Sequence, residues 1–254
     1  MQCTGNALVY RHDFCDGLGG WLGWESNAAG ARALVIQDGA VVSPGPWWID
    51  YNHAPPGGGY LNLLFALHTV HSANFPQQYK DLGGLNTFVA GGFPLDFTNA
   101  RITVEVRGDL TARGAQMVLL AQAKVGDRYQ NHVLISQPIE VRQDWSQTTL
   151  RLVPDDGQWI SLGSRHDRTT TYGHGTVRDV LRCLNGDIIF VLYPLDVRPL
   201  TSSLDDPHIL RAGEDYAVNP AYLPEGSVAM RSIQIEFAQC GLGDVELAAT
   251  REGK

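Results

Sequence analysis

The sequence predicts an all-β protein, an antiparallel β-sandwich (jelly roll) with one short helix and two long irregular loops. Short stretches of alternating apolar and polar residues recur along the chain, and Gly, Pro, Asp and Asn separate them. Helical spacing of apolar residues occurs in one place. The two loops, at about 43–99 and 193–231, are too long for simple connections. We expect a single domain over residues 1–254, because β-sandwiches reach this size.

The clearest strand covers residues 100–107. Ile102, Val104 and Val106 fall on one face and polar residues on the other, which is typical of a half-buried strand. The segment 61–68 fits a buried strand or a short helix, and we favour the strand. Further strands are expected at 116–123, 132–136, 148–153, 188–192 and 232–237.

The helical segment begins after Thr176. Four apolar residues repeat at helical spacing, namely Val177, Val180, Leu181 and Leu184. Thr176 stands at the N-cap position and Asp179 follows three residues later, the spacing of a capping box. Gly186 ends the segment, so we expect a short helix that leads directly into a strand.

Charge and hydropathy exclude several classes of partner. The chain has 19 Lys and Arg against 27 Asp and Glu, a net charge of -8, so it lacks the clustered basic residues that attract nucleic acid. Apolar runs such as 188–192 fall well short of the roughly 20 residues that a membrane helix needs, so we expect no membrane partner. Residues 1–6 contain neither a basic nor an apolar stretch of an export signal. The compartment and the oligomeric state stay open.

The four cysteines do not predict a metal centre. Cys3, Cys15, Cys183 and Cys240 form no CxxC pair and have no His at zinc-finger spacing. Scattered buried thiols are the simplest interpretation. A disulfide between Cys3 and Cys240 is the alternative, since a jelly roll often brings its end strands together.

Five motifs follow one another along the chain. They are Asp13-Phe14-Cys15-Asp16-Gly17 with Gly20-Trp21, then Pro94 to Gly108, then Asp144-Trp145 before residues 148–152, and finally residues 187–190 and 232–237. In this order they resemble the galactose-binding-like jelly-roll superfamily, which includes many carbohydrate-binding modules. The resemblance implies the fold. It leaves the activity open, because the same fold hosts binding modules, hydrolases, lyases and cyclases.

The resemblance also implies a structural Ca²⁺ ion, because it places the opening loop beside the closing strand, where many relatives hold one. The candidate oxygen ligands are Asp13, Asp16 and Glu236. Cys15 departs from the pattern, since relatives often carry an acid at that position.

The first long loop concentrates aromatic and polar side chains. They are Trp47, Trp48, Asp50, Tyr51, Asn52, His53 and Tyr60. Aromatic faces pack against the C–H surface of a sugar and polar groups bind its hydroxyls, so the pattern indicates a saccharide or other polyol ligand. In the alternative interpretation the paired tryptophans only anchor the loop in the core.

These residues support a carbohydrate-binding protein. The rival hypothesis is an enzyme on the same scaffold, such as a polysaccharide lyase, a glycoside-active enzyme or a cyclase. Its catalytic residues would be His53 or His166 as base, Tyr51 or Tyr172 as acid, and Arg165 to neutralise charge. The loop 163–175 supplies three of these residues, although a solvated loop with internal salt bridges explains its composition equally well.

Two further patterns carry less information. His68 and His71 would share a face and bind a metal only in a helix, and without a third ligand we favour polar residues at a strand end. Gly57-Gly58-Gly59 is flanked by Pro56 and Tyr60 and does not join a strand to a helix, so no nucleotide cofactor is expected.

Overall fold

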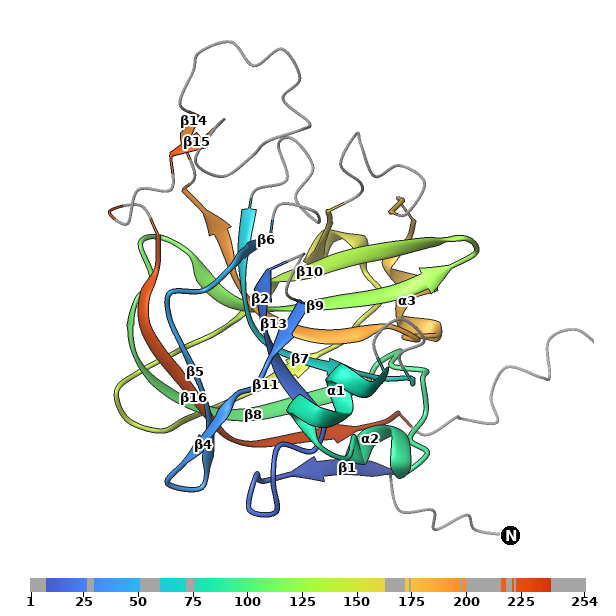
Figure 1. Cartoon of the computed structure of the whole chain (residues 1–254). Helices are drawn as coiled ribbons and strands as arrows, with labels where there is room; N and C mark the ends of the chain where they lie inside the picture. The colour runs from blue at the N-terminus through green and yellow to red at the C-terminus, as the bar shows by residue number, and fades with distance from the viewer. Residues whose placement is uncertain are drawn as a thin grey trace, which may run out of the picture.

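The fold is an antiparallel β-sandwich, which confirms the fold class (Figure 1). The computed structural model describes residues 8–26, 30–50, 60–71, 76–162, 172–173, 175–196, 198–199, 216–217, 221 and 223–238. Two sheets face each other, and a pair of short strands, β14 (Arg198–Pro199) and β15 (Tyr216–Ala217), forms a separate ribbon.

The first sheet has six strands, and the long strand β16 (Glu225–Glu236) is its centre. On one side β16 pairs with β8 (Arg101–Thr111), which pairs with β11 (Ser146–Arg151). On the other side its first half pairs with β5 (Ala40–Pro44), which pairs with β4 (Val35–Gln37). Its last residues pair with β1 (Val9–His12), so the opening segment lies beside the closing strand as expected.

The second sheet has eight strands. Seven follow one another in the order β12 (Trp159–Ser161), β10 (Arg128–Ile139), β9 (Gln116–Val125), β13 (Asp187–Leu195), β7 (Tyr60–His68), β2 (Trp21–Ser26) and β3 (Gly30–Arg32). The eighth, β6 (Ile49–Asp50), pairs with the start of β7 beside β2. The segment that fitted either a strand or a helix is therefore a strand, and the other expected strands are present.

The main core lies between the sheets. Ile102, Val104 and Val106 of β8 are fully buried there, which confirms the alternation seen in the sequence. Trp21 stacks on Phe190 across the second sheet, at 5.9 Å between ring centroids. These contacts fix which face of each strand points outward.

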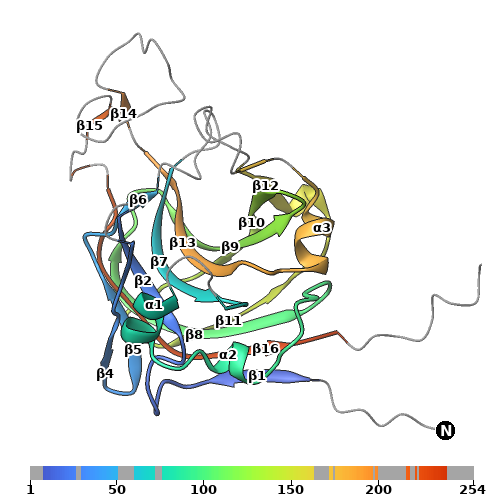
Figure 2. The same ribbon diagram turned by 45° about the vertical axis from the view of Figure 1, so that its right-hand side comes forward.

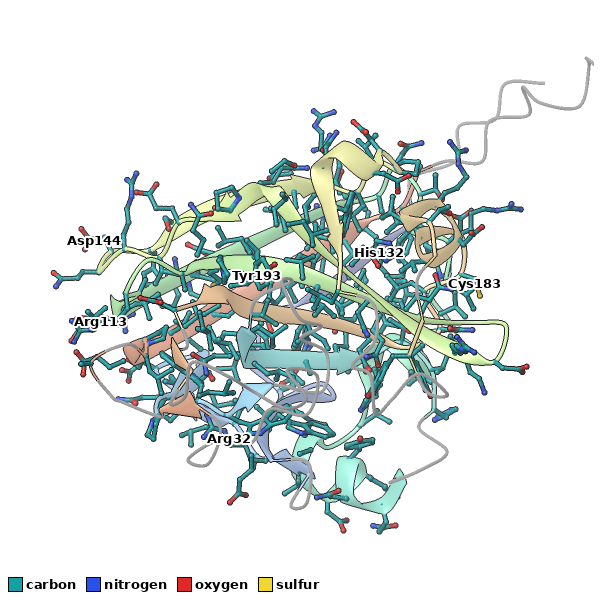
Figure 3. All side chains as sticks on the ribbon, turned by 90° about the horizontal axis from the view of Figure 1, so that it is seen from above. Arg32, Arg113, His132, Asp144, Cys183 and Tyr193 are labelled. Carbon is teal, nitrogen blue, oxygen red and sulfur yellow. The ribbon has the colours of Figure 1, made fainter. Side chains whose placement is uncertain are left out.

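A second apolar cluster covers the outward face of the eight-stranded sheet. Its buried members are Leu61, Leu63, Ala66, Val118, Leu120, Val133, Leu162, Ile189, Val191 and Tyr193. β9 and β13 therefore bury side chains on both faces, which explains why their sequences are continuously apolar rather than alternating. Figure 3 labels Tyr193 on this sheet.

The expected helix is α3 (Val177–Arg182). The Thr176 side chain accepts a hydrogen bond from the Asp179 backbone N–H at 3.2 Å and donates to the Asp179 carboxylate at 2.8 Å. The side chains of Val177, Val180 and Leu181 enter the main core. The N-cap at Thr176 and the apolar stripe are therefore confirmed, but Asp179 contacts the Thr176 hydroxyl, whereas a capping box requires it to accept the Thr176 backbone N–H.

Two helices were not expected. Both α1 (Pro76–Gly83) and α2 (Thr87–Ala90) lie in the segment assigned to an irregular loop, beside β1 and β2 (Figure 2). α1 is rich in polar residues and buries little of its surface, so it has no apolar stripe. α2 is one turn long and buries Phe88. Neither gives the periodic signal that sequence reasoning depends on. A single-turn 3-10 helix, Asp156–Gln158, precedes β12.

The second long loop is shorter than expected at both ends. β13 continues to Leu195, and β16 begins at Glu225 rather than near residue 232. A register shift between Met230 and Ser232 places an extra residue in β16 and breaks the alternation there. Within the described part of the chain, no helix has the length and apolar character needed to cross a membrane.

Candidate functional site

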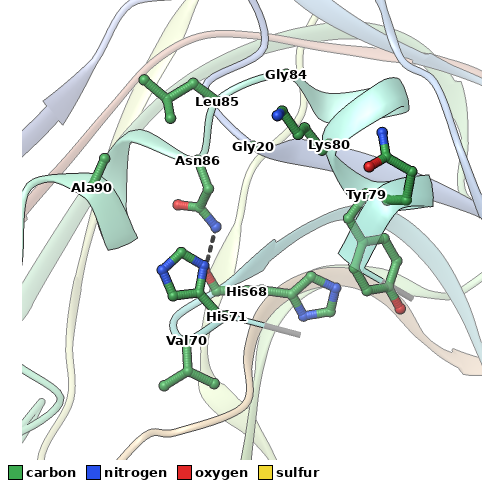
Figure 4. Close-up of a pocket in the computed structure, with 11 residues that line it drawn as sticks. Gly20, His68, Val70, His71, Tyr79, Lys80, Gly84, Leu85, Asn86 and Ala90 are labelled. Carbon is green, nitrogen blue, oxygen red and sulfur yellow. Dashed lines mark hydrogen bonds between the residues drawn. The ribbon is translucent and has the colours of Figure 1, made fainter. Parts of the chain in front are cut away.

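A pocket of about 550 Å³ lies where β7 ends and the two short helices begin (Figure 4). We call it the β7 pocket. Its lining comes from the end of β7, from α1 and α2 and from the turn before β2. The lining residues are Gly20, His68, Val70, His71, Gln77, Tyr79, Lys80, Gly84, Leu85, Asn86 and Ala90.

Backbone hydrogen bonds fasten the helices to the strands. The Gly20 N–H donates to the Gly83 carbonyl at 2.9 Å, and the Thr87 N–H donates to the Gly19 carbonyl at 3.0 Å. Gly20 has φ +93°, and a Cβ there would come 2.7 Å from Asn86, so this approach requires glycine. Backbone contacts therefore fix the positions of the elements that line the pocket.

The side chain of Asn86 connects α2 to the end of β7. Its side-chain oxygen accepts the Val89 N–H at 3.0 Å and caps α2, and its amide nitrogen donates to the His68 carbonyl at 2.8 Å, the dashed line of Figure 4. Both ends of the Asn86 amide are occupied by these contacts. Asn86 therefore holds α2 against the end of β7. We expect other residues of the pocket to contact a ligand.

The His68 ring forms an ion pair with Asp187. The two residues lie directly opposite each other on β7 and β13, and His68 Nδ1 contacts the Asp187 carboxylate. Their side chains are 18% and 13% exposed. Because Nδ1 is engaged, the carboxylate fixes the orientation of the ring and favours the tautomer whose Nε2 accepts a proton.

The environment tunes the charge of this histidine. Burial alone would lower the pKa of His68, but the negative charge of Asp187 and the hydrogen bond with it outweigh burial and raise the pKa above its ordinary value.

An aromatic row leads away from the His68 side chain. The Tyr79 ring lies 4.2 Å from the His68 ring, the Trp24 ring 6.4 Å from Tyr79, and the Trp48 ring 6.4 Å from Trp24, all between centroids. Trp24 and Trp48 pack against the outward cluster of the eight-stranded sheet. The row therefore runs from the pocket across that face.

Lys80 gives the lining of the β7 pocket a fixed positive charge, whereas the charge of a protonated His68 is offset by its partner Asp187. Lys80, His68 and His71 line the pocket, and among the described lining residues there is no Asp or Glu. The whole chain carries a net charge of -8. Local positive charge in an acidic protein favours an anionic group in this pocket.

The two predicted tryptophans lie in different surroundings. Trp47 is only 5% exposed, packs in the main core and donates from Nε1 to Ser43 Oγ at 3.0 Å. Trp48 is half-buried and belongs to the aromatic row. The Asn62 amide donates to the carbonyls of both, at 3.2 and 3.1 Å, which fixes the backbone at this point. Trp47 therefore anchors the chain in the core, whereas Trp48 packs against the outward cluster of the eight-stranded sheet.

Other predicted site residues lie outside the described part of the chain. They are Tyr51, Asn52, His53, Arg165 and His166. Asp50 ends β6 and Tyr60 begins β7, and only their backbones are described. Tyr172 forms a backbone bridge with Tyr129, and their rings lie 6.3 Å apart. Cys3 and Cys240 are also outside. Cys15 and Cys183 are free thiols, but both are exposed, so the expectation of buried thiols is wrong for these two.

The three predicted calcium ligands do not converge. Glu236 pairs with Val9 and lies 3.4 Å from Arg101, whereas Asp13 follows the other end of β1, about 13 Å along the strand pair. Asp13 accepts the Cys15 N–H at 3.1 Å, a contact that lowers the pKa of Asp13. Among the described residues no group of three His, Cys, Asp or Glu could hold a metal ion. Calcium stays a prediction, but these three carboxylates do not form one site.

Sequence reasoning did not predict the β7 pocket, although it singled out two of its lining residues. It placed His68 and His71 at a strand end, and both now line the pocket. It missed Tyr79 and Lys80, because α1 lacks a helical signal. It missed Asp187 as the partner of His68, because strand order and register bring these distant residues together.

Comparisons with known proteins do not assign a function. No family model matches the chain, and no curated protein matches it. One similar solved structure comes from work on endo-acting O-glycanases that human gut bacteria express to initiate mucin breakdown. It has 10% identity and a TM-score of 0.36, and the match covers 92% of this chain and 100% of that one. Another is CtCBM11, solved in solution, with 11% identity, a TM-score of 0.29, and coverage of 92% and 86%. Both TM-scores are below 0.5, so the fold assignment rests on the strand topology.

Proposed function

We propose that this protein binds a saccharide, and that the β7 pocket receives a sugar unit that carries a carboxylate. The observation that supports this most is the combination of an aromatic ring and a cation in one pocket. Tyr79 offers an apolar face, and Lys80 lies beside it. A pyranose ring needs such a face for its C–H groups, and a carboxylate needs such a cation.

The aromatic row extends this binding surface. Trp24 and Trp48 follow Tyr79 at spacings of 6.4 Å. An elongated ligand would place one unit in the pocket and further units along the row. The proposed ligand is still a saccharide and Trp48 still contacts it, as the sequence predicted. The centre of the proposed site, however, is at His68 and Tyr79.

The test is calorimetric titration with a panel of neutral and uronate-containing oligosaccharides. Tyr79→Ala removes the ring and should weaken binding at least about tenfold. Lys80→Gln should weaken binding of uronate-containing ligands more than that of neutral ones. Tyr129→Ala and Lys124→Gln are the matched controls, because neither residue lines the pocket. Unchanged affinity in Tyr79→Ala would contradict the proposal.

An acid–base enzyme on the same scaffold is the second candidate, and the His68 and Asp187 pair specifically favours it. A carboxylate that holds Nδ1 leaves Nε2 to take a proton, and the neighbouring Tyr79 hydroxyl is a group that donates one. Incubating each bound saccharide and analysing products by mass spectrometry separates the two functions. Products that form with the wild-type chain and disappear in His68→Gln establish the enzyme, whereas binding without products excludes it for that ligand.

A further inference from the structure

A second hollow, of about 310 Å³, lies on the outward face of the six-stranded sheet. It belongs to the opposite sheet from the β7 pocket and shares no lining residue with it. Its lining residues are Gln37, Val42, Arg107, Gly108, Asp109, Gln143, Ser227 and Ala229. We call it the Arg107 hollow.

Arg107 is held in place by an aromatic ring. Its guanidinium carbon lies 4.7 Å from the centroid of Trp145, and that of Arg231 lies 4.5 Å from the same ring. Arg231 also pairs with Glu105, with 3.1 Å between Nε and Oε2. In the described part of the chain Arg107 has no such carboxylate partner. Its N–H groups are thus oriented by stacking and left to meet a ligand.

Other polar groups converge on the same hollow from different elements. Asp109 lies two residues beyond Arg107 on β8 and so on the same face. Gln37 comes from β4 and Ser227 from β16. Gln143 comes from the segment before β11, which is tied down because the Gly108 N–H donates to the Arg142 carbonyl at 2.7 Å. Its neighbour Asp144 lies at the periphery of the molecule in Figure 3.

The hollow also has apolar lining residues. They are Val42 and Ala229, which are paired across β5 and β16. Val35 pairs with Val42 on the next strand and is 58% exposed. An exposed valine beside a polar hollow provides a surface for the C–H groups of a ligand whose hydroxyls face Arg107 and Asp109.

We propose that the Arg107 hollow is a second ligand site, which takes a neutral saccharide through two adjacent hydroxyls. A guanidinium donates two parallel hydrogen bonds and a carboxylate accepts two, so each can bind a pair of neighbouring hydroxyls. Arg107 and Asp109 carry opposite charges, and together they leave no net charge to attract an ion. Two glutamine amides and a serine hydroxyl supply further donors and acceptors. This site is independent of the β7 pocket.

The test is a titration of isotope-labelled protein, followed by NMR, with neutral gluco-, manno-, xylo- and galacto-oligosaccharides and one uronate oligomer. At least one neutral ligand should shift the backbone amides of Arg107, Asp109, Gln143 and Ser227. Arg107→Gln should weaken this binding about tenfold. Lys80→Gln should leave it unchanged, which separates this site from the β7 pocket.

Arg101→Gln is the matched control, because Arg101 lies on the same outward face of β8 but outside the hollow. Gln143→Ala is a second variant. Because Gln143 lies in a loop, this substitution still tests the site if Arg107→Gln alters the fold. The proposal is overturned if no neutral ligand shifts these amides at millimolar concentration, if only the uronate oligomer does, or if Arg107→Gln and Gln143→Ala both bind as the wild type does.

Discussion

The outward faces of the two sheets differ although both sheets are antiparallel and enclose the same core. On the eight-stranded sheet the outward residues of β9 and β13, such as Leu120 and Ile189, are buried in a second apolar cluster. On the six-stranded sheet the outward residues of β8 include Thr103 and Glu105, which are polar and reach solvent. The sequence distinguishes the two, because continuous apolar runs form the first and alternation forms the second. Outward side chains of β9 and β13 should therefore contribute more to stability than outward side chains of β8 and β11.

The largest expected effect is on the buried outward face. Leu120 is 1% exposed, so Leu120→Ala should lower the free energy of unfolding by about 2–5 kcal/mol. Thr149→Ala, on the exposed outward face of β11, should change it by about 0.5 kcal/mol or less, as surface substitutions generally do. Urea denaturation of both variants provides the comparison. Equal losses of unfolding free energy in the two variants would show that the outward faces of the two sheets contribute equally to stability.

A smaller effect is expected from the His68 and Asp187 pair, and it should depend on pH. Because the folded-state pKa of His68 is raised, protonated His68 stabilises the fold fully below about pH 6.5, and this contribution is lost as the pH rises through the raised pKa. The stability difference between wild type and His68→Gln should thus be about 1.5–3 kcal/mol at low pH and shrink above neutrality. A difference that does not vary with pH would show that the ion pair is not the cause. His71→Gln serves as the control.

The smallest effect should come from the ion pair on the other face. Glu105 and Arg231 are 27% and 44% exposed, and such pairs contribute little because water and salt screen them. Glu105→Gln should therefore unfold at the same denaturant concentration as wild type, at both low and high salt. A clear loss of stability at low salt would mean that this face contributes to the fold more than its exposure implies.

Local patterns predicted the local parts of the structure. Alternation in β8 and the N-cap at Thr176 needed only neighbouring residues, and both are confirmed. The start of β16 was missed because a bulge at Arg231 interrupts the alternation. The β7 pocket could not be predicted, since it depends on the register that places Asp187 opposite His68 and on the polar helix α1. For the same reason the sequence could not show that Trp47 lies in the main core and that Trp48, the next residue, packs on the outward face of the eight-stranded sheet.

The pairing of β1 with β16 determines how the sandwich would respond to mechanical force. Val9 at the start of β1 lies opposite Glu236 at the end of β16, so both outer ends of the pair are at the same place. A force that pulls these two ends apart would load one rung of backbone hydrogen bonds at a time. The strands would then open like a zipper instead of resisting together in shear. This edge of the six-stranded sheet is thus the place where tension would begin to open the fold.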